Sequence, residues 1–210
     1  MNRANFAAEA SFSDVGALRA AFGCQAIDLR PGSTVRLVGE ISLDRSIVFE
    51  GDCRLEGPVS IQRGSMLTNV RLGAGTQVRP YSILSDLFGG ARNILGPFCF
   101  IRDGCITGDD VILGAHVEAA RSRFSSNVKV SHRAFIGDAT IGEGSIVGAG
   151  VVFCNYDDGQ RHATKIGAGV TIGSGSLLVA PLRVGDRVII AAGSVATKDL
   201  PDDSKLLQRR

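Results

Sequence analysis

The sequence predicts an all-β protein folded as a parallel β-helix, with a short helical cap at its N-terminal end. Apolar residues recur every six positions from Leu37 to Ile190, glycine often follows the apolar residue, and aromatic residues make up only 6% of the chain. Neither an α-helix nor an ordinary strand has a period of six, whereas hexapeptide repeats are typical of parallel β-helices. A β-sandwich, which has turn signals every 8–12 residues, does not fit this spacing.

Three hexapeptides would make one triangular coil, with the repeated apolar side chain pointing into the prism. About 160 residues at roughly 18 per coil predict about nine coils. The pattern weakens across "SDLFGGARNI", where "LFGGARN" is expected to be a corner or loop. Only Thr107 is polar among the repeat positions, which are Leu37, Leu43, Phe49, Leu55, Ile61, Leu67, Leu72, Val78, Leu84, Leu95, Ile101, Thr107, Leu113, Ala119, Phe124, Val130, Ile136, Ile141, Val147, Phe153, Ile166, Ile172, Leu178, Val184 and Ile190.

The repeat divides the chain into an N-terminal arm with a short helix (1–33), the β-helix (34–196) with a protruding loop at 154–165, and a C-terminal tail (197–210). In "SFSDVGALRAAFG", Ser13 is a candidate N-cap and Gly23 a helix stop. Because exposed sheet edges need protection, this helix is expected to cover the open end of the first coil.

Composition argues against several classes of protein. The net charge is +2, from 23 basic and 21 acidic residues, and nucleic-acid binding would require a basic stripe. No apolar run is long enough for a membrane span, and the first residues lack the apolar stretch of a signal peptide. Five scattered cysteines without a CxxC pair indicate a reducing compartment rather than a disulfide framework. We therefore expect a soluble cytoplasmic protein that binds neither nucleic acid nor membrane.

The repeat breaks between Phe153 and Ile166, where "CNYDDGQRHATK" forms a polar excursion. Residues one coil apart stack in space, so the repeat phase predicts that Glu118, His132 and Asn155 converge along one corner. A carboxylate that orients a histidine makes it a better general base near neutral pH. The alternative is that His132 and Glu118 are surface residues and that the segment beginning at Asn155 is simply a turn.

A zinc site is the other chemistry to consider for a β-helix enzyme. The three histidines His116, His132 and His162 lie 16 and 30 positions apart and in different phases of the repeat. No closely spaced histidine pair is present, so a histidine-rich zinc site is not expected.

Several segments resemble one known enzyme family. "GPFCFIRDG", "GAHVEAARSRF", "SHRAFIGDATIGEGSIVGAGVVFCNYD" and "IGSGSLLVAPLRVGDRVIIAAGSVATKDLP" are similar to the acetyltransferase domain of the bifunctional enzymes that make UDP-N-acetylglucosamine, which acetylates glucosamine 1-phosphate. The likeness covers roughly Leu72 to Arg210 and does not include the family's nucleotidyltransferase domain. It implies a left-handed β-helix, a homotrimer with active sites between subunits, and acetyl-CoA as the acyl donor.

The resemblance also implies a role for each matching residue. His132 matches the general base, Glu118 its carboxylate, and Asn155 and Tyr156 an Asn-Tyr pair at the reaction centre. Arg102 matches an arginine that contacts the sugar phosphate, and Arg161 takes the place of a lysine. The positions that match acetyl-CoA contacts are Ala149, Ser174, Ala192 and Arg209, and Lys198, Lys205 and Arg210 supply further positive charge for its phosphates.

The departures from the family fall on the acceptor side. Ala120 stands where the family has a lysine, Phe135 where it has a tyrosine, and Ile146 where it has an asparagine; Asp158 replaces a glycine. Each lost hydrogen bond to a charged group is worth ~1.5–3 kcal/mol. The expected acceptor is therefore a small-molecule amine, on a sugar or a sugar-derived molecule, other than glucosamine 1-phosphate.

The resulting hypothesis is N-acyl transfer from acetyl-CoA, with His132 as base, Glu118 stabilising the imidazolium, and backbone N–H groups around Gly148 and Ala149 as oxyanion donors, with Asn155 nearby. Neither a metal nor a covalent intermediate through Cys154 is required. Three alternatives stay open at this point: a catalytically degenerate binding or assembly protein, an O-acyltransferase, and a metal-dependent β-helix enzyme.

Overall fold

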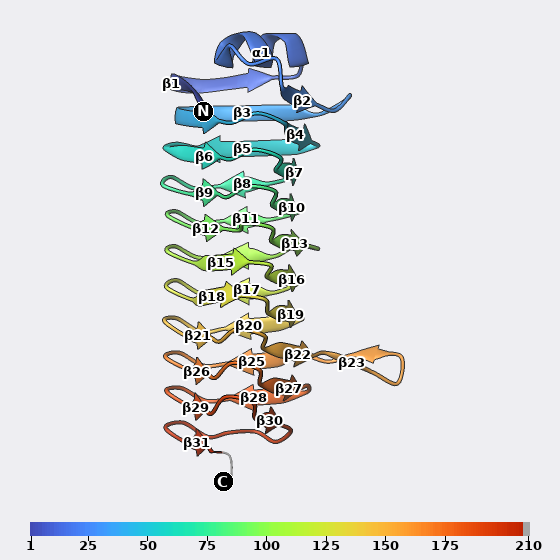
Figure 1. Ribbon diagram of the computed structural model, residues 1–210, viewed down its shortest axis with the longest axis vertical. Coiled ribbons are helices and arrows are strands. Elements are labelled where there is room, and N and C mark those ends of the chain that lie inside the picture. Colours follow the sequence, from blue (N-terminus) through green and yellow to red (C-terminus); the bar gives the residue numbers. More distant parts are fainter. Residues whose placement is uncertain (208–210) are drawn as a thin grey trace.

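The computed structural model describes residues 1–207, which form a single column of stacked coils with a helix at one end and a hairpin protruding from one side (Figure 1). Almost every strand pairs in parallel with the strand one coil away. The predicted left-handed parallel β-helix with a helical cap is confirmed.

The column has three faces. One of them, called the third face, is a separate ten-stranded sheet. The other two, called the first and second faces, share their first strand, β3 (Thr34–Leu43). The first face contains β5 (Asp52–Glu56), β8 (Arg71–Leu72), β11 (Phe88–Gly89), β14 (Ile106–Thr107), β17 (Arg123–Phe124), β20 (Ala139–Ile141), β25 (Thr164–Ile166) and β28 (Leu182–Val184). The second contains β6 (Val59–Ile61), β9 (Gln77–Val78), β12 (Ile94–Leu95), β15 (Ile112–Ala115), β18 (Lys129–His132), β21 (Ile146–Val147), β26 (Thr171–Ile172), β29 (Ile189–Ile190) and β31 (Lys205–Leu206). The third contains β2 (Ile27–Leu29), β4 (Ile47–Glu50), β7 (Met66–Thr68), β10 (Ile83–Ser85), β13 (Phe100–Arg102), β16 (Glu118–Ala120), β19 (Phe135–Gly137), β22 (Val152–Cys154), β27 (Leu177–Val179) and β30 (Val195–Ala196).

The period-six residues form the core. Every predicted repeat position is buried, with at most 4% of its surface exposed. Because successive strand residues point to opposite sides, one inward residue per short strand is enough to fill a narrow prism. Four of the five cysteines, Cys24, Cys53, Cys99 and Cys105, also lie in this core, and all five are free.

The weak stretch of the repeat has a structural reason. In β11 the inward position is Gly89, which pairs with Leu72 in one neighbouring coil and Thr107 in the other. The buried side chain of Asn93 occupies the interior nearby: its Nδ2 donates to Thr107 Oγ1 at 2.8 Å and its Oδ1 accepts from Val111 N at 2.8 Å. "LFGGARN" is thus partly a strand and not only a corner or loop, and Thr107 is polar because it is the partner of a buried amide.

Replacing Thr107 with valine is therefore expected to destabilise the protein although the shape of the side chain is kept. The Asn93 amide would lose a buried acceptor, a loss that costs about 1–3 kcal/mol. Urea unfolding of Thr107→Val, compared with Thr140→Val at an exposed position of the same face, measures this cost. Equal unfolding free energies for the two variants would contradict it.

The N-terminal cap differs in detail from the prediction. The helix α1 (Val15–Phe22) buries Leu18 and Phe22 and ends at Gly23 in a left-handed conformation, as expected. Its N-cap is Asp14, not Ser13, because the Asp14 carboxylate accepts from Ala17 N at 2.8 Å. The strand β1 (Asn2–Phe12), which the repeat did not predict, lies antiparallel on β3 and covers the free edge of the first coil.

The solenoid also extends beyond the predicted range of 34–196. At its start, β2 already pairs with β4 in the third face, and at its end β31 pairs with β29 in the second face. The polar excursion forms a protruding two-stranded hairpin, β23 (Tyr156–Asp157) and β24 (Gln160–Arg161), which we call the arm. No helix within residues 1–207 is long and apolar enough to cross a membrane.

Candidate functional site

Four of the predicted site residues lie in one column. The His132 edge is the edge where strands of the second face end and those of the third begin. There Gly150 N donates to His132 O at 3.2 Å, Gly175 N to Ala149 O at 2.8 Å, and Gly193 N to Ser174 O at 2.8 Å. The same register places Ala192 in the next coil after Ser174. His132, Ala149, Ser174 and Ala192 thus follow one another along a single edge.

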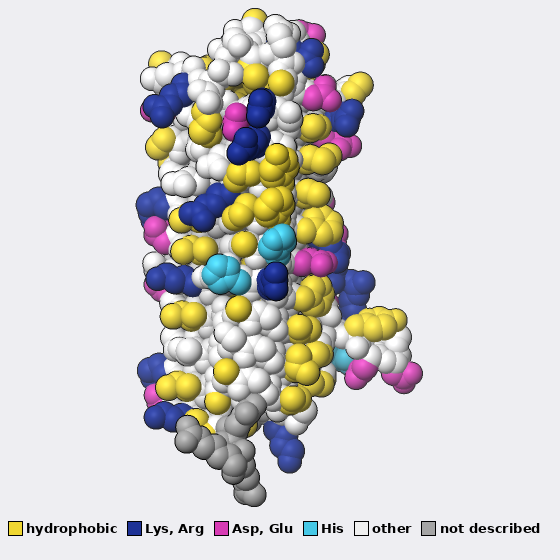
Figure 2. Space-filling view, in the orientation of Figure 1, with side chains coloured by type: hydrophobic (Ala, Val, Ile, Leu, Met, Phe, Trp, Pro, Cys, Tyr) yellow, Lys and Arg dark blue, Asp and Glu magenta, His cyan; other side chains and the backbone are white. Residues whose placement is uncertain are grey.

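This edge is exposed to solvent, and the backbones of successive coils pack closely beside it. The side chains of all four residues are exposed. A Cβ added to Gly148 would lie 2.6 Å from Ser174 N, and one added to Gly173 would lie 2.3 Å from Ala192 N. Figure 2 shows histidine side chains at mid-height of the visible face, above a broad surface, mostly white, of backbone and uncharged polar side chains with scattered hydrophobic ones, which runs toward the C-terminal coils. A long flexible ligand can therefore lie along the edge with few bulky side chains in its way.

Glu118 lies on the third face, in the coil before His132. From Val48 to Val195, Glu118 is the single ionisable residue in an outward column that begins at Asp28. The other residues of that stretch are apolar: Val48, Met66, Ile83, Phe100, Phe135, Val152, Leu177 and Val195. Glu118 Oε1 accepts from Arg102 Nη2 at 2.8 Å. Among residues 1–207, no side-chain hydrogen bond joins Glu118 to His132, so the expected orienting contact between them is absent from the single chain.

Asn155 is on the opposite edge, which corrects the predicted convergence. It follows β22 at what we call the Asn155 edge, where strands of the third face end and those of the first begin. His132 precedes the third face and Asn155 follows it, so the width of that sheet separates them. The repeat phase placed both residues in neighbouring coils but did not resolve which corner each occupies.

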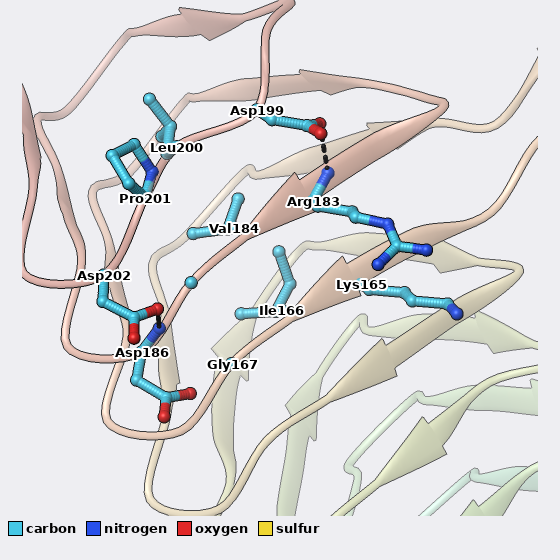
Figure 3. Close-up of a pocket in the computed structure, with 11 residues that line it drawn as sticks. Lys165, Ile166, Gly167, Arg183, Val184, Asp186, Asp199, Leu200, Pro201 and Asp202 are labelled. Atoms are coloured by element: carbon cyan, nitrogen blue, oxygen red, sulfur yellow. Dashed lines mark hydrogen bonds between the residues drawn. The ribbon is translucent and has the colours of Figure 1, made fainter.

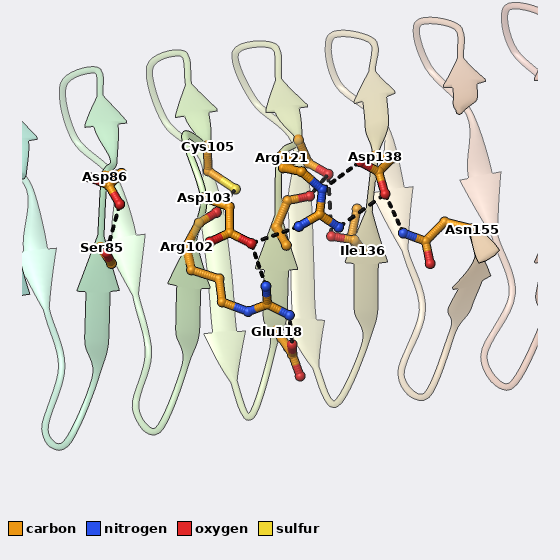
Figure 4. Close-up of polar contacts among 12 residues, drawn as sticks. Ser85, Asp86, Arg102, Asp103, Cys105, Glu118, Arg121, Ile136, Asp138 and Asn155 are labelled. Carbon is orange, nitrogen blue, oxygen red and sulfur yellow. Dashed lines mark hydrogen bonds and ion pairs between the residues drawn. The ribbon is translucent and has the colours of Figure 1, made fainter. Parts of the chain in front are cut away.

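A ladder of charged side chains lines the Asn155 edge (Figure 4). Arg102 contacts Asp103 and Glu118, Arg121 donates to Asp103 at 2.7 Å and to Asp138 at 2.7 Å, and Asp138 accepts from Asn155 Nδ2. The ladder therefore joins Arg102, Glu118 and Asn155, three predicted site residues. Sequence reasoning missed its other members, and their spacing of 17 or 18 residues, close to one coil, was the available signal.

Mutual pairing sets the charge states of the ladder. Hydrogen bonding from Arg121, aided by Asn155, holds the pKa of Asp138 below its usual value, although partial burial opposes the shift. Hydrogen bonding to Glu118 raises the pKa of Arg102, and hydrogen bonding to Asp138 raises that of Arg121. Both guanidinium groups are thus charged, and Asp138 is an ionised carboxylate at neutral pH.

The arm carries the predicted substrate-binding residues Tyr156 and Arg161. They face each other across the hairpin, and 64% of the Tyr156 surface is exposed. The base of the arm is closed by His162 N donating to Asn155 O at 2.9 Å, and Asp157 Oδ1 lies 2.6 Å from His162 Nε2. The arm therefore holds Tyr156 away from the coils of its own chain.

One predicted cofactor residue, Lys198, lies elsewhere. Lys198 is exposed in the corner that follows β30, at the Asn155 edge rather than the His132 edge. Arg209 lies outside the described residues.

A hollow on the first face near the C-terminal coils contains none of the predicted site residues (Figure 3). Its charged lining mixes Lys165 and Arg183 with Asp186, Asp199 and Asp202. Within residues 1–207, no three histidine, cysteine or acidic side chains gather in a way that could hold a metal ion.

Known proteins share this sequence pattern. Residues 163–198 match the family described as bacterial transferase hexapeptide (six repeats). The bifunctional protein GlmU of Acinetobacter baylyi is 38% identical over 182 residues, which cover 87% of this chain and 40% of that protein. GlmU of Aromatoleum aromaticum is 40% identical over 170 residues, which cover 81% of this chain and 37% of that protein.

The chain thus spans about 40% of the length of the curated relatives it matches. Among solved structures, LpxA, a UDP-N-acetylglucosamine acyltransferase from Bacteroides fragilis, is 15% identical with a TM-score of 0.32, over 84% of this chain and 68% of that one. That likeness is too low to bear on function.

Proposed function

We propose that this chain, a hexapeptide-repeat protein that resembles GlmU over 87% of its length, is an acyltransferase that moves an acetyl group from acetyl-CoA to an amine on a sugar or sugar-derived acceptor. The observation that carries the proposal is the His132 edge. His132 stands at the head of an exposed column of small residues that continues through Ala149, Ser174 and Ala192. This arrangement suits a cofactor whose thioester lies beside His132 and whose pantetheine chain lies along the coils.

In this reaction the amine nitrogen attacks the thioester carbon, and His132 accepts a proton from that nitrogen. The carbon–sulfur bond then breaks, the amide forms, and the CoA sulfur leaves as a thiol after taking up the proton. Backbone N–H groups near Ala149 would stabilise the oxyanion. We assign Glu118, whose Oε1 accepts from Arg102 Nη2, to stabilising the positive charge that forms on His132 during the reaction.

The positions that the resemblance assigns to binding of the acceptor substrate are more apolar in this chain than in the family. Phe135 and Ile146 place hydrocarbon on the outside of two faces, 46% of Ile146 being exposed, and Ala120 is fully buried. Arg102, Tyr156 and Arg161 remain as polar or charged groups for the acceptor. We infer an acceptor other than glucosamine 1-phosphate, in which apolar contacts replace part of the recognition of the phosphate.

A homotrimer would complete the site. The exposed apolar column of the third face is the kind of patch that marks an association surface. If three chains turn their third faces toward a common axis, the His132 edge of each lies beside the Asn155 edge of the next. His132 and Asn155, which one chain separates, would then meet between subunits. Light scattering should therefore give the mass of a trimer.

Subunit mixing tests this shared site. Trimers of His132→Ala chains alone and of Asn155→Ala chains alone should both be inactive. Co-expression of the two should restore about one quarter of the sites, because random assembly in a cyclic trimer pairs an intact His132 with an intact neighbouring Asn155 at that frequency. Mixed trimers as inactive as the separate variants would contradict a site shared in this way.

A matched panel of acceptors tests the activity itself. Release of the CoA thiol should be followed with amino sugars, their nucleotide-linked and phosphorylated forms, and the corresponding hydroxyl sugars at the same position. Turnover with amines alone supports N-acyl transfer, and turnover with the hydroxyl compounds would instead show O-acyl transfer. Tight binding of acetyl-CoA without release from any acceptor would favour a binding protein. We further infer that the enzyme acts in the cytoplasm, where acetyl-CoA is available, and that in the trimer Lys198, on the Asn155 edge of the neighbouring subunit, lies near the cofactor phosphates.

A further inference from the structure

The side chain of Asn155 is held in one orientation by its neighbours. Only 8% of the residue is exposed, and its amide points at Asp138 (Figure 4). An ionised carboxylate can only accept hydrogen bonds. The Asn155 atom next to Asp138 must therefore be Nδ2, and Oδ1 must face the other way.

Arg121 fixes the carboxylate in turn. Its Nε and Nη2 donate to the two oxygens of Asp138, at 2.7 and 3.1 Å, and its Nη1 donates to Asp103. Such a bidentate pair has a well-defined geometry as well as strong hydrogen bonds. Asp138 is thus held on one side by Arg121, and its remaining capacity as an acceptor is directed at Asn155.

Gly137 supplies the space for this arrangement. It pairs with Ala120 in the preceding coil, so the backbone at this position of the sheet accommodates a Cβ. At Gly137 itself, however, an added Cβ would lie 2.4 Å from Asn155 Nδ2 and 3.0 Å from the Phe135 ring. The glycine is required here because the Asn155 amide occupies the space that a methyl group would fill.

The free end of the amide is its oxygen. Within residues 1–207, Asn155 Oδ1 has no hydrogen-bond partner, and it is not among the buried side-chain atoms left without one. It is therefore accessible from outside the coil. In this orientation one N–H of Asn155 is committed to Asp138, and the atom that faces away from Asp138 is the oxygen, which can accept a hydrogen bond from a ligand N–H.

We propose that Asp138, supported by Arg121 and Gly137, is a positioning residue that makes Asn155 a hydrogen-bond acceptor toward the donor group of the acceptor substrate. The inference rests on the proposed acyl transfer. A reacting amine must direct its lone pair at the thioester carbon, and an N–H bond held by Asn155 Oδ1 would orient it. Asn155 thus acts through its oxygen, as an acceptor for the substrate amine, and not as the oxyanion donor.

A swap of the two side chains tests the orientation. Asn155→Asp alone places two carboxylates in contact, which raises the pKa of one or separates them, and Asp138→Asn alone removes the group that fixes the amide. Each is expected to lower kcat at least about tenfold while the KM for acetyl-CoA stays near the wild-type value. The double variant Asp138→Asn/Asn155→Asp restores a donor–acceptor pair and leaves a carboxylate oxygen facing outward, although the amide at position 138 accepts only one of the two hydrogen bonds from Arg121. It should recover part of the lost kcat and exceed both single variants.

If Asn155 acted as a donor, the double variant would recover no kcat, because a carboxylate at position 155 has no N–H. A double variant no more active than the better single variant would overturn the proposal. The matched control uses the Asn–Asp pair near the other end of the same edge, where Asn69 Nδ2 donates to Asp86 Oδ1 at 3.1 Å. The swap Asn69→Asp/Asp86→Asn should leave kcat unchanged.

A spectroscopic readout separates this proposal from the enzymatic one. The side-chain amide protons of Asn155, assigned by their loss in Asn155→Ala, should exchange slowly in the wild-type protein and quickly in Asp138→Asn. Gly137→Ala should perturb the same signals. Amide signals indifferent to both substitutions would overturn the positioning role whatever the activity. If they respond while no acceptor is acylated, the proposed function fails and the arrangement of Asn155 stands.

Discussion

Replacing His132 with alanine is expected to lower kcat for acyl transfer by about 10²–10⁴-fold, the usual contribution of a general base. The side chain is exposed, and His132 makes no side-chain hydrogen bond within residues 1–207. Its loss should therefore leave folding and acetyl-CoA binding intact. Thiol release measured with both acetyl-CoA and the acceptor saturating isolates the effect on kcat from any effect on binding.

His116 provides the matched control for this substitution. It is an exposed histidine one coil earlier on the same edge, stacked on Phe98 with ring centroids 5.1 Å apart. His116→Ala should keep nearly all of the activity. An equal loss of kcat in the two variants, or none in His132→Ala, would show that the base has been assigned to the wrong residue.

Replacing Ser174 with arginine is expected to weaken acetyl-CoA binding at least about 100-fold, or ~2.7 kcal/mol. The position lies at the middle of the small-residue edge, one coil beyond Ala149. A long guanidinium side chain there would occupy the path proposed for the pantetheine chain. A ligand that binds only the native state raises the unfolding temperature, so acetyl-CoA should stabilise the wild type and not the variant.

Ser125→Arg is the corresponding control. Ser125 is exposed in the corner between the first and second faces, away from the His132 edge. The same added side chain there should leave the stabilisation by acetyl-CoA unchanged. Equal stabilisation of the Ser174 and Ser125 variants would place the cofactor elsewhere on the molecule.

The fold could be predicted from the sequence because one residue type at one spacing determines it. Each short strand contributes a single inward side chain, so the positions from Leu37 to Ile190 give the coil directly. The six-residue spacing fails at Gly89, which has no side chain to point into the core. The hydrogen-bonded pair of Asn93 and Thr107 occupies the interior there, and a count of apolar positions does not detect such a polar pair. The strand β1 was missed because it lies antiparallel on the end of the solenoid and has no place in the repeat.

The candidate site was only partly predictable. Resemblance identified His132, Ala149, Ser174 and Ala192, and the register places them in one column. Phase alone could not show that Asn155 lies across the third face from His132, because the three corners of a coil have the same period. Nor could it show that Arg121 and Asp138 connect Arg102 to Asn155, since side-chain reach decides those contacts.

Calorimetric titration of the wild-type protein with acetyl-CoA tests the central claim most directly. Acyl transfer along the His132 edge requires that edge to bind the donor, and we predict micromolar affinity with one site per chain. Acetyl-CoA that evolves no heat of binding and gives no stabilisation at millimolar concentration would contradict the account and would leave a β-helix with another role.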